Sequence, residues 1–311
     1  MTTATVRRIA TMNDTTVEIA ETAGGHHVAT KHAHTPAAAV ALDDYTRHLR
    51  AFAAIPALSE HYPPVLDHAP GTMTMPYYPG GTLHDLSDPA ERSDRLSEVV
   101  AAHLRISSTH ALTGHHHQYA GVDGARRFWR DQLRTRLRRL ADAGFDMRRP
   151  PMPAITAWAD DRLDAALTAT VARPLALAAH GDLAMANIVL DGPHQRFIDL
   201  RGVWANGLPW WDPVLDAASM IAFDALIKPA LGIGHTDPPT PDHITDLFAD
   251  RAPAGWWQTH DPRWRDRLAI GLLIRQVGSI GTQLTTAPRD RETRADTVLD
   301  LLRETTPDVI A

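Results

Sequence analysis

The side chains best suited to chemistry lie between residues 180 and 202, in the sequence HGDLAMANIVLDGPHQRFIDLRG. Asp182 precedes a short β-strand pattern that begins at Asn187, and Asp199 stands in a second such pattern, residues 196–200. Asp191-Gly192 between the two patterns is a strong signal for a β-hairpin turn. Because a hairpin folds its ends back on each other, we expect Asp182, Asn187 and Asp199 to converge.

Two carboxylates and an amide in one place suit phosphoryl transfer from a nucleotide. A carboxylate can accept the proton of an attacking hydroxyl group, and carboxylate and amide oxygens are the ligands that Mg²⁺ prefers. Protein kinases place the base and the metal ligands in H-R-D-x-x-x-x-N and D-F-G. Here Asn187 follows Asp182 by five positions, and Asp199 follows Asn187 by twelve.

This region resembles the aminoglycoside phosphotransferase and choline kinase branch of the protein-kinase-like fold, which carries HGDxxxxN and I-D-x-x-x at these places. The resemblance implies that Asp182 is the catalytic base and that Asn187 and Asp199 bind Mg²⁺. Residues 211–218, WDPVLDAA, contain the D-P-x-x-D-x-A part of a further family pattern, W-x-D-P-x-x-D-x-A. In the family the two carboxylates of that pattern brace the catalytic loop.

The alternative is that these residues have only a structural role, because a lone Asp-x-x-x-x-Asn is common and an Asp-Gly turn by itself indicates no function. The combination of spacing, flanking strands and the downstream WDP is far rarer, and it favours the kinase-like reading.

Three short strands are predicted before residue 36, and they cover residues 5–10, 16–20 and 27–32. In kinases the third strand carries a lysine that grips the nucleotide phosphates, and Lys31 in V-A-T-K-H stands where V-A-I-K would place it. The chain has only two lysines, Lys31 and Lys228, so this position favours phosphate binding over a solvated strand lysine. The covering loop, residues 11–15, contains no glycine and so departs from the family pattern.

A helix is predicted over residues 36–54, with Pro36 near its start and apolar residues at helical spacing. In the family this helix presents a glutamate to the strand lysine. The acidic candidates here are Asp43 and Asp44, one methylene shorter, and Asp44 is our choice. The alternative is an exposed helix carboxylate.

A hinge between two lobes is predicted after a β-hairpin that turns at Pro70-Gly71. Backbone groups around Met75, Tyr77 and Tyr78 would hold the nucleobase, as the family resemblance implies. The predicted lobes are 1–76, which binds nucleotide, and 83–311, which is helical and carries the catalytic loop and the acceptor pocket. Residues 77–82 form the predicted hinge.

Further helices are predicted at residues 90–112, 123–143, 153–172, 213–228, 241–250, 262–285 and 290–303. The helix at 123–143 is rich in arginine, which could suggest nucleic acid, but a solvated face suits a chain of net charge −6 better. Consecutive histidines at 115–117 lack metal-ligand spacing, so a polar loop is favoured there, and a structural role is favoured for His110.

Composition excludes several classes of protein. The 311 residues contain no cysteine, which rules out disulfides and thiolate catalysis. No run of about eighteen apolar residues predicts a membrane span. The first ten residues lack the apolar segment of a signal peptide, so a cytoplasmic location is expected.

The sequence therefore predicts an α+β, two-lobed protein-kinase-like fold, with a small antiparallel sheet in the N-lobe and a larger, mainly helical C-lobe. The predicted function is transfer of the γ-phosphate of ATP or GTP, with Mg²⁺, to a hydroxyl of a small metabolite. That acceptor is plausibly an antibiotic such as a nucleoside, an aminoglycoside or another sugar-containing compound. The alternative is a degenerate kinase-like protein that binds nucleotide without transfer. The acceptor and the oligomeric state stay open.

Overall fold

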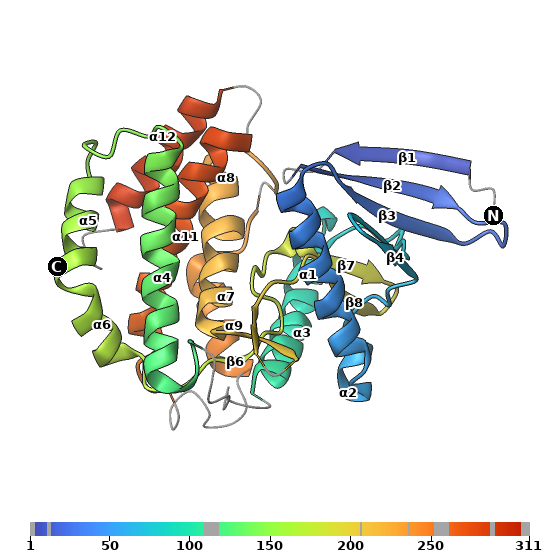
Figure 1. The fold of residues 1–311 in the computed structure, drawn as a ribbon, viewed down its shortest axis with the longest axis horizontal. Helices are drawn as coiled ribbons and strands as arrows, with labels where there is room; N and C mark the ends of the chain where they lie inside the picture. The colour runs from blue at the N-terminus through green and yellow to red at the C-terminus, as the bar shows by residue number, and fades with distance from the viewer. Residues whose placement is uncertain are drawn as a thin grey trace. The chain divides into compact units, whose positions relative to one another are not determined.

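The structure is a computed structural model, and it describes residues 4–10, 14–108, 118–205, 207–235, 237–251, 261–286 and 290–305 (Figure 1). The chain forms two compact units. The first contains residues 1–95 and 185–209, and the second contains residues 96–184 and 210–311. The predicted boundaries, 1–76, 77–82 and 83–311, stay a prediction, although residues 83–95 and 185–209 group with the N-terminal residues in the structure.

The first unit is built on a five-stranded antiparallel sheet in the order β1-β2-β3-β5-β4 (Figure 1). Its strands are β1 (Ala4–Ala10), β2 (Thr15–Glu21), β3 (His27–Ala33), β4 (Asp67–Ala69) and β5 (Thr72–Pro76). The predicted hairpin between β4 and β5 is confirmed, because Ala69 pairs with Thr72 and leaves Pro70-Gly71 as the turn. Gly71 has a φ of 74°, which a side chain would disfavour.

Helix α1 (Pro36–Ala53) packs on β3 and β5, and α2 (Pro56–Ser59) follows it. The predicted helix start is confirmed, since Thr35 accepts a hydrogen bond from the Ala38 backbone N–H at 3.2 Å and Pro36 occupies the first turn. The apolar residues at helical spacing form the buried face, which includes Leu42, Leu49 and Phe52.

The predicted hairpin near the catalytic motif is confirmed as β7 (Ile188–Asp191) paired with β8 (His194–Phe197). Asp191 pairs with His194, so Gly192-Pro193 form the turn, one residue later than predicted. The second strand ends at Phe197, so Asp199 lies just beyond the strand and not on it. The first unit also contains η1 (Leu83–Asp85), η2 (Met185–Asn187) and β9 (Val203–Ala205).

Backbone bonds join this hairpin to the N-terminal residues of the first unit. The Leu190 N–H donates to the Gly81 carbonyl at 2.9 Å, and the Phe197 N–H donates to the His61 carbonyl at 2.8 Å. A hairpin far along the chain therefore belongs to the unit that carries Lys31.

The second unit is mainly helical. Its elements are α4 (Gly121–Asp142), α5 (Met152–Asp161), α6 (Leu163–Thr170), β6 (Ala176–Leu177), α7 (Pro213–Met220), the π-helix η3 (Ile221–Ile227), α8 (Lys228–Ala230), α9 (Pro241–Arg251), α11 (Trp264–Thr286) and α12 (Arg291–Thr305). Helix α3 (Pro89–Ser107) spans the sequence boundary between the units, and so does β10 (Leu208–Trp211), whose Trp210 pairs with Leu177 of β6.

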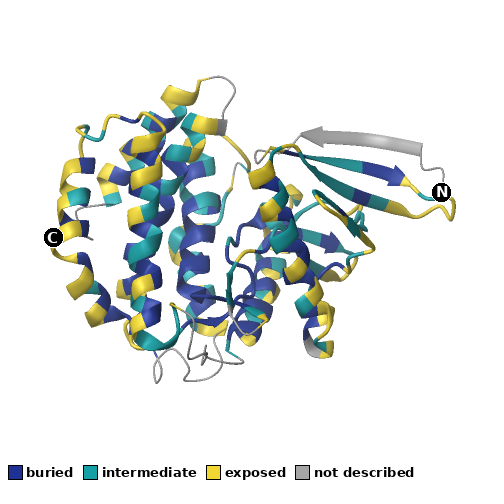
Figure 2. Cartoon of the chain, viewed as in Figure 1, coloured by how far each residue is buried: buried dark blue, intermediate teal, exposed yellow. Residues whose placement is uncertain are grey.

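The core of the second unit lies around α11, which packs against α4, α7 and α12 (Figure 1). Every residue of α7 is buried, as Figure 2 shows. One predicted helix, 153–172, is wrong in detail because it divides at Arg162, which leaves helical geometry with a φ of −123°. The predicted helix 213–228 is also divided, because its second half is the π-helix η3.

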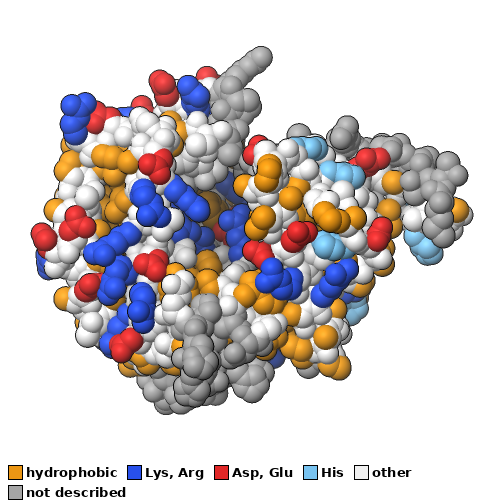
Figure 3. All heavy atoms as spheres, viewed as in Figure 1, with side chains coloured by type: hydrophobic (Ala, Val, Ile, Leu, Met, Phe, Trp, Pro, Cys, Tyr) orange, Lys and Arg blue, Asp and Glu red, His pale blue; other side chains and the backbone are white. Residues whose placement is uncertain are grey.

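Helix α4 is amphipathic, as predicted. Phe128, Trp129 and Leu133 are fully buried, whereas Arg127 and Arg138 are exposed. Figure 3 shows basic side chains gathered over this helix. Across the residues that can be described, no helix has the length and apolar character needed to cross a membrane.

Candidate active site

The predicted base lies in a loop that follows the buried strand β6. Residues 175–181 are all buried, which holds the start of the loop in the core of the second unit. The side chain of Asp182 is 18% exposed, so it is partly accessible to solvent. The Asp182 backbone N–H donates to Nδ1 of His180 at 3.1 Å, which fits the orienting role expected for this histidine.

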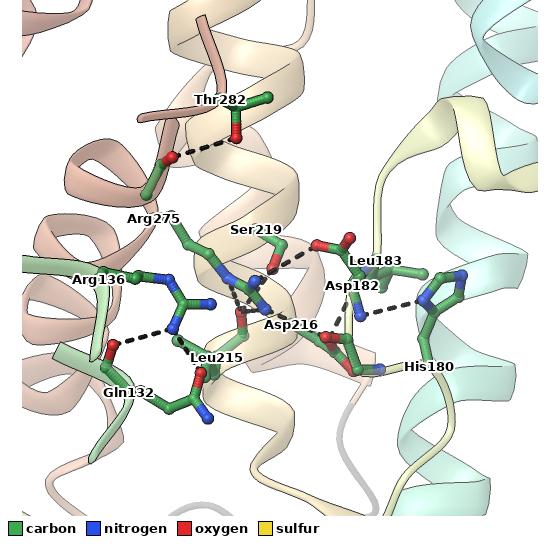
Figure 4. A network of polar contacts seen from close by, with 12 residues as sticks. Gln132, Arg136, His180, Asp182, Leu183, Leu215, Asp216, Ser219, Arg275 and Thr282 are labelled. Atoms are coloured by element: carbon green, nitrogen blue, oxygen red, sulfur yellow. Dashed lines mark hydrogen bonds and ion pairs between the residues drawn. The ribbon is translucent and has the colours of Figure 1, made fainter. Parts of the chain in front are cut away.

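Asp216 of α7 braces this loop from below (Figure 4). Its carboxylate accepts hydrogen bonds from the backbone N–H groups of Gly181 at 3.0 Å and Leu183 at 3.4 Å. It also accepts one from Nε2 of His103 at 2.8 Å, and both side chains are buried. The bracing role that the family resemblance implied for this carboxylate is therefore visible in the contacts.

Arg275 of α11 contacts the predicted base directly (Figure 4). Its Nη1 lies 3.3 Å from Oδ1 of Asp182, and its Nη2 donates to the Gly181 carbonyl at 3.3 Å and to the Leu215 carbonyl at 3.4 Å. The residue is 5% exposed. We call Asp182, His180, Asp216, His103 and Arg275 the Asp182 network.

Asp212, the other carboxylate of the WDP pattern, ties three helices together. It caps α7 by accepting the Val214 backbone N–H at 2.9 Å, and it accepts the indole N–H of Trp129 at 2.7 Å. Arg267 of α11 pairs with Asp212 and with Asp261. Burial acts to lower the pKa of Arg267, but the two carboxylates outweigh it and raise that pKa above its ordinary value.

In the first unit, Lys31 of β3 forms an ion pair with Asp199, as the kinase reading of both residues would allow. The lysine side chain is 15% exposed and the aspartate side chain 37%. Asp199 has a φ of 58°, in the left-handed region that non-glycine residues rarely adopt and that aspartate tolerates better than most. Such backbone strain is concentrated at functional sites.

Tyr45 of α1 faces this ion pair. The Lys31 ammonium lies 5.5 Å from the centre of the Tyr45 ring, and the Tyr45 hydroxyl donates to Sδ of Met75 at 3.9 Å. Burial and the charge of Asp199 together raise the pKa of Tyr45 well above 10. We call Lys31, Asp199 and Tyr45 the Lys31 cluster.

The choice of Asp44 as the helix carboxylate that faces Lys31 needs correction. Asp44 pairs with Arg47 at 2.6 Å, and Asp43 pairs with His68 at 2.9 Å. Both aspartates are off the buried face of α1, whereas Tyr45 lies on it. The helix therefore presents an aromatic ring to the lysine, which pairs with Asp199 instead.

Asn187 lies at the end of η2, where the hairpin begins. Its backbone carbonyl accepts the Ile198 N–H at 2.9 Å, which brings Asn187 close to the residue that precedes Asp199. The hairpin thus gathers the two predicted metal ligands. The expected convergence of Asp182 with them stays a prediction, because Asp182 belongs to the second unit.

The predicted hinge follows directly after β5, an inner strand of the sheet. The Tyr77 backbone N–H donates to the His27 carbonyl at 3.1 Å, so that hinge donor is engaged by β3. The Arg196 guanidinium lies 5.3 Å from the centre of the Tyr78 ring, and burial raises the pKa of Tyr78. Nucleobase binding by Met75, Tyr77 and Tyr78 stays a prediction. Most of the covering loop, residues 11–13, and the histidines at 110 and 115–117 lie outside the described residues.

Comparison with solved structures identifies the fold. A choline kinase from Cryptosporidium parvum Iowa II matches with a TM-score of 0.61 and 13% identity, over 98% of this chain and 89% of that one. An aminoglycoside phosphotransferase, APH(2'')-Ib, solved with ADP bound, matches with a TM-score of 0.57 and 14% identity, over 98% of this chain and 94% of that one. The chain has the protein-kinase-like fold of choline kinases and aminoglycoside phosphotransferases. The predicted fold class is confirmed.

A type I macrolide 2'-phosphotransferase shares this kinase-like fold, with a TM-score of 0.57 and 13% identity over 96% of this chain and 90% of that one. No sequence-family model matches the chain, and no curated protein matches it in sequence. The likeness is therefore one of fold, and it spans nearly the whole chain.

Sequence reasoning missed three residues that the structure places at the predicted site. They are Tyr45 beside Lys31, Arg275 beside Asp182, and His103 beside Asp216. Helical periodicity could have indicated Tyr45, because it continues the apolar stripe of Leu42 and Leu49. A charged residue inside the apolar run LLIRQV could have drawn attention to Arg275.

Proposed function

We propose that this protein is a small-molecule kinase that transfers the γ-phosphate of ATP or GTP to a hydroxyl group of a small acceptor. The observation that carries the proposal is the Lys31–Asp199 ion pair. Its two members stand 168 positions apart in the chain and were assigned separately to phosphate and metal binding. The shared fold with enzymes named as small-molecule kinases supports the same conclusion.

In this proposal Asp182 accepts the proton of the acceptor hydroxyl as its oxygen attacks the γ-phosphorus atom. A new P–O bond forms, the bond to the β–γ bridging oxygen breaks, and ADP or GDP leaves with that electron pair. Lys31 exchanges its contact with Asp199 for the nucleotide phosphates and neutralises part of their charge. Positioning and charge neutralisation then supply most of the rate enhancement.

The donor set of the first unit fits Mg²⁺. Asn187 and Asp199 offer an amide and a carboxylate oxygen, which are hard ligands, from neighbouring positions at one end of the hairpin. Within the described ranges, no three histidine, aspartate or glutamate side chains gather in a group that could hold a metal ion. Nucleotide phosphates and waters would complete the coordination, as is usual for Mg²⁺. When bound, the ion would neutralise the charge that develops on the transferring phosphate.

The acceptor we propose is a hydroxylated metabolite, with sugar-containing antibiotics as the first class to test. This choice rests on analogy with the named relatives in fold, because fold does not by itself assign a substrate.

The decisive experiment is mass-spectrometric detection of phosphate transfer from Mg·ATP or Mg·GTP to a pooled panel. The panel contains aminoglycosides, nucleoside antibiotics, macrolides, amino sugars, choline and simple sugars. Wild type should form a phosphorylated product, and Asp182→Asn should lower the rate by about 10²–10⁴-fold, because a general base contributes that much. Asp161→Asn, the same change at an exposed aspartate, should keep full activity.

The outcomes separate the two candidate functions. A product formed equally by wild type and Asp182→Asn would contradict the role of Asp182. Mg²⁺-dependent nucleotide binding with no product, and no phosphate release to water, would favour a degenerate nucleotide-binding protein. An absence of nucleotide binding would overturn both.

A further inference from the structure

We infer that Arg275 is a positioning residue for Asp182. It lies on α11, outside the predicted catalytic motif, and from there it fixes the orientation of the Asp182 carboxylate and favours its ionised form. The inference rests on the proposed function, because it assigns a role to a contact of the proposed base. Arg275 touches no reacting atom in this assignment, and it acts through Asp182 alone.

The geometry of the guanidinium suits this role. Its two terminal nitrogens divide between the Asp182 carboxylate and the backbone carbonyls of Gly181 and Leu215. The same group therefore holds the side chain of the base and the backbone of the residue before it. A planar fork with several donors can make these contacts together, whereas a lysine ammonium is a compact point charge.

Arg275 is itself held firmly. It is almost completely buried on α11, and its guanidinium lies 5.8 Å from the centre of the Trp211 ring. Its Nε also approaches the Leu215 carbonyl at 3.4 Å, so α7 fixes the side chain from a second direction. A site is precise when the residues that hold it have their own rotamers locked by packing.

Close helix packing fixes α11 one turn beyond Arg275. A Cβ atom at Gly278 would lie 2.9 Å from Nε of Arg136 on α4, so the arginine of one helix lies directly against the backbone of the other. Figure 4 shows Arg136 and Arg275 projecting from their two helices on the same side of α7. A small shift of α11 would therefore be resisted by α4 as well as by α7.

Four ionisable groups contact the base, its loop or each other. They are His180 of the loop itself, Asp216 of α7, His103 of α3 and Arg275 of α11. Arg136 of α4 lies against α11 at Gly278. Asp216 and His103 pair with each other. Arg275 contributes the permanent positive charge that contacts Asp182, and an opposite charge at this distance favours the ionised carboxylate.

The test compares Arg275→Gln with Arg275→Lys in the full chain. The probe reaction is phosphate release from Mg·ATP to water, together with transfer to any acceptor that the panel identifies. Arg275→Gln should lower kcat by about 10²-fold, since a misplacement of about 1 Å can cost that much, with little change in KM for ATP. As pH falls, Arg275→Gln should lose activity at a higher pH than wild type does. The acid limb of its pH–rate profile should lie about one pH unit or more above that of wild type.

Arg275→Lys keeps the positive charge but lacks the planar guanidinium with its several donors. Its acid limb should return toward the wild-type position while kcat stays reduced. In an Asp182→Asn background, Arg275→Gln should cause no further loss, because residues that act as one unit are non-additive.

Two other arginines serve as controls, Arg263 just before α11 and Arg267 on that helix. Arg263→Gln, at an exposed position, should leave the rate and the pH profile unchanged. Arg267→Gln, at a buried position away from Asp182, should lower Tm without moving the acid limb. A shift of the acid limb in Arg267→Gln as large as in Arg275→Gln would show that general loosening causes it, and would overturn the inference.

A measurement without turnover separates this inference from the proposed function. Carboxyl NMR, with Asp182→Asn to assign the signal, should show Asp182 titrating at higher pH in Arg275→Gln than in wild type. If wild type is active and Arg275→Gln shows the same Asp182 titration or the same pH–rate profile as wild type, the role of Arg275 is overturned and the kinase proposal stands. A shifted titration in a protein that transfers no phosphate would support the contact and overturn the proposed function.

Discussion

The Asp182 network and the Lys31 cluster hold their carboxylates in opposite ways. In the second unit, Asp216 is buried and accepts three hydrogen bonds, and Arg275 is almost fully buried beside Asp182. In the first unit, Lys31 and Asp199 are partly exposed and pair with each other. The first arrangement is expensive to disturb, whereas the second can exchange partners.

This difference fits the requirements of the proposed phosphoryl transfer, which needs an oriented base and a phosphate-binding group that can change partners. A base must be oriented before the acceptor arrives, because orientation gained in advance costs nothing during the reaction. A phosphate-binding lysine and a metal-binding carboxylate must instead release their contacts when the nucleotide binds. In the proposed function, the Lys31–Asp199 pair compensates both charges until then. Stability should therefore depend on the Asp182 network, and nucleotide affinity on the Lys31 cluster.

The largest expected effect on stability is that of Asp216→Ala. It leaves a buried histidine and two backbone N–H groups without their acceptor, and breaking such a buried charged contact costs about 3–5 kcal/mol. Chemical denaturation of the variant measures this cost. Asp161→Ala, an exposed aspartate, should change the free energy of unfolding by less than about 0.5 kcal/mol. Equal effects from the two variants would show that the buried contacts of Asp216 do not stabilise the fold.

The chain's two lysines provide the next test, because one lies in each unit. Lys31→Met should lower the affinity for Mg·ATP by about 10–100-fold, the value of a charged hydrogen bond of about 1.5–3 kcal/mol. Its effect on the free energy of unfolding should stay below about 1 kcal/mol, because the ion pair is partly exposed. Titration calorimetry and denaturation give the two numbers.

Lys228→Met is the matched control and should show the reverse pattern. Lys228 pairs at 2.7 Å with Asp224, whose side chain is fully buried in the π-helix. Loss of the lysine should cost about 1–3 kcal/mol of stability and leave nucleotide affinity unchanged. If Lys228→Met weakens nucleotide binding as much as Lys31→Met does, the assignment of Lys31 to the phosphates is wrong.

Two glycines of α11 test how tightly the frame of the Asp182 network is packed. A Cβ at Gly271 would lie 2.8 Å from Cβ of Ala218 on α7, so Gly271→Ala should destabilise the protein by about 1–3 kcal/mol. A Cβ at Gly281 would meet its nearest neighbour at an ordinary 3.9 Å, so Gly281→Ala should stabilise it by about 0.5–1 kcal/mol. Opposite shifts of Tm are expected, and shifts of the same sign would show that α11 is not closely packed at Gly271.

The smallest effects concern tyrosine ionisation. Burial, with a hydrogen bond to Asp131, raises the pKa of Tyr119 from 10 to about 12. Because the folded protein favours the neutral form of Tyr119, this residue contributes stability that is complete below pH 10 and is lost as pH rises toward 12. The stability advantage of wild type over Tyr119→Phe should therefore shrink in that window. Alkaline denaturation measures it, and a constant difference across the window would contradict the shift.

Tyr45 extends this comparison to the Lys31 cluster. The charge of Asp199 is one of the causes that raise its pKa, so Asp199→Asn should lower the pKa of Tyr45 and leave that of Tyr119 in place. The absorbance of tyrosinate during an alkaline titration reports both. A Tyr45 titration that Asp199→Asn does not alter would argue that burial alone sets it.

Local patterns in the sequence predicted most of the elements. The Asp-Gly and Pro-Gly signals located both hairpins, and the helical spacing of apolar residues located α1 and α4, since turn chemistry and periodicity are properties of short segments. The HGDxxxxN and WDP patterns located the predicted catalytic loop and the carboxylate that braces it. The kinase-like fold followed from the combination of these features.

The errors came where long-range contacts decide. Arg275 stands 93 positions from Asp182, and no local pattern connects the two. Asp44 was chosen by analogy with a family glutamate, although the burial pattern of α1 places Tyr45, and not Asp44, on the inner face. The break at Arg162 has neither proline nor glycine to indicate it in the sequence.

The separation between Asp182 and Arg275 also has a consequence during translation. Asp182 leaves the ribosome 93 residues before Arg275 does. At elongation rates of about 5–20 residues per second, the nascent chain carries the motif for roughly 5–20 s before the arginine is even synthesised. Throughout this interval Asp182 lacks its contact with Arg275, so the HGDxxxxN motif exists in the growing polypeptide before that contact can form.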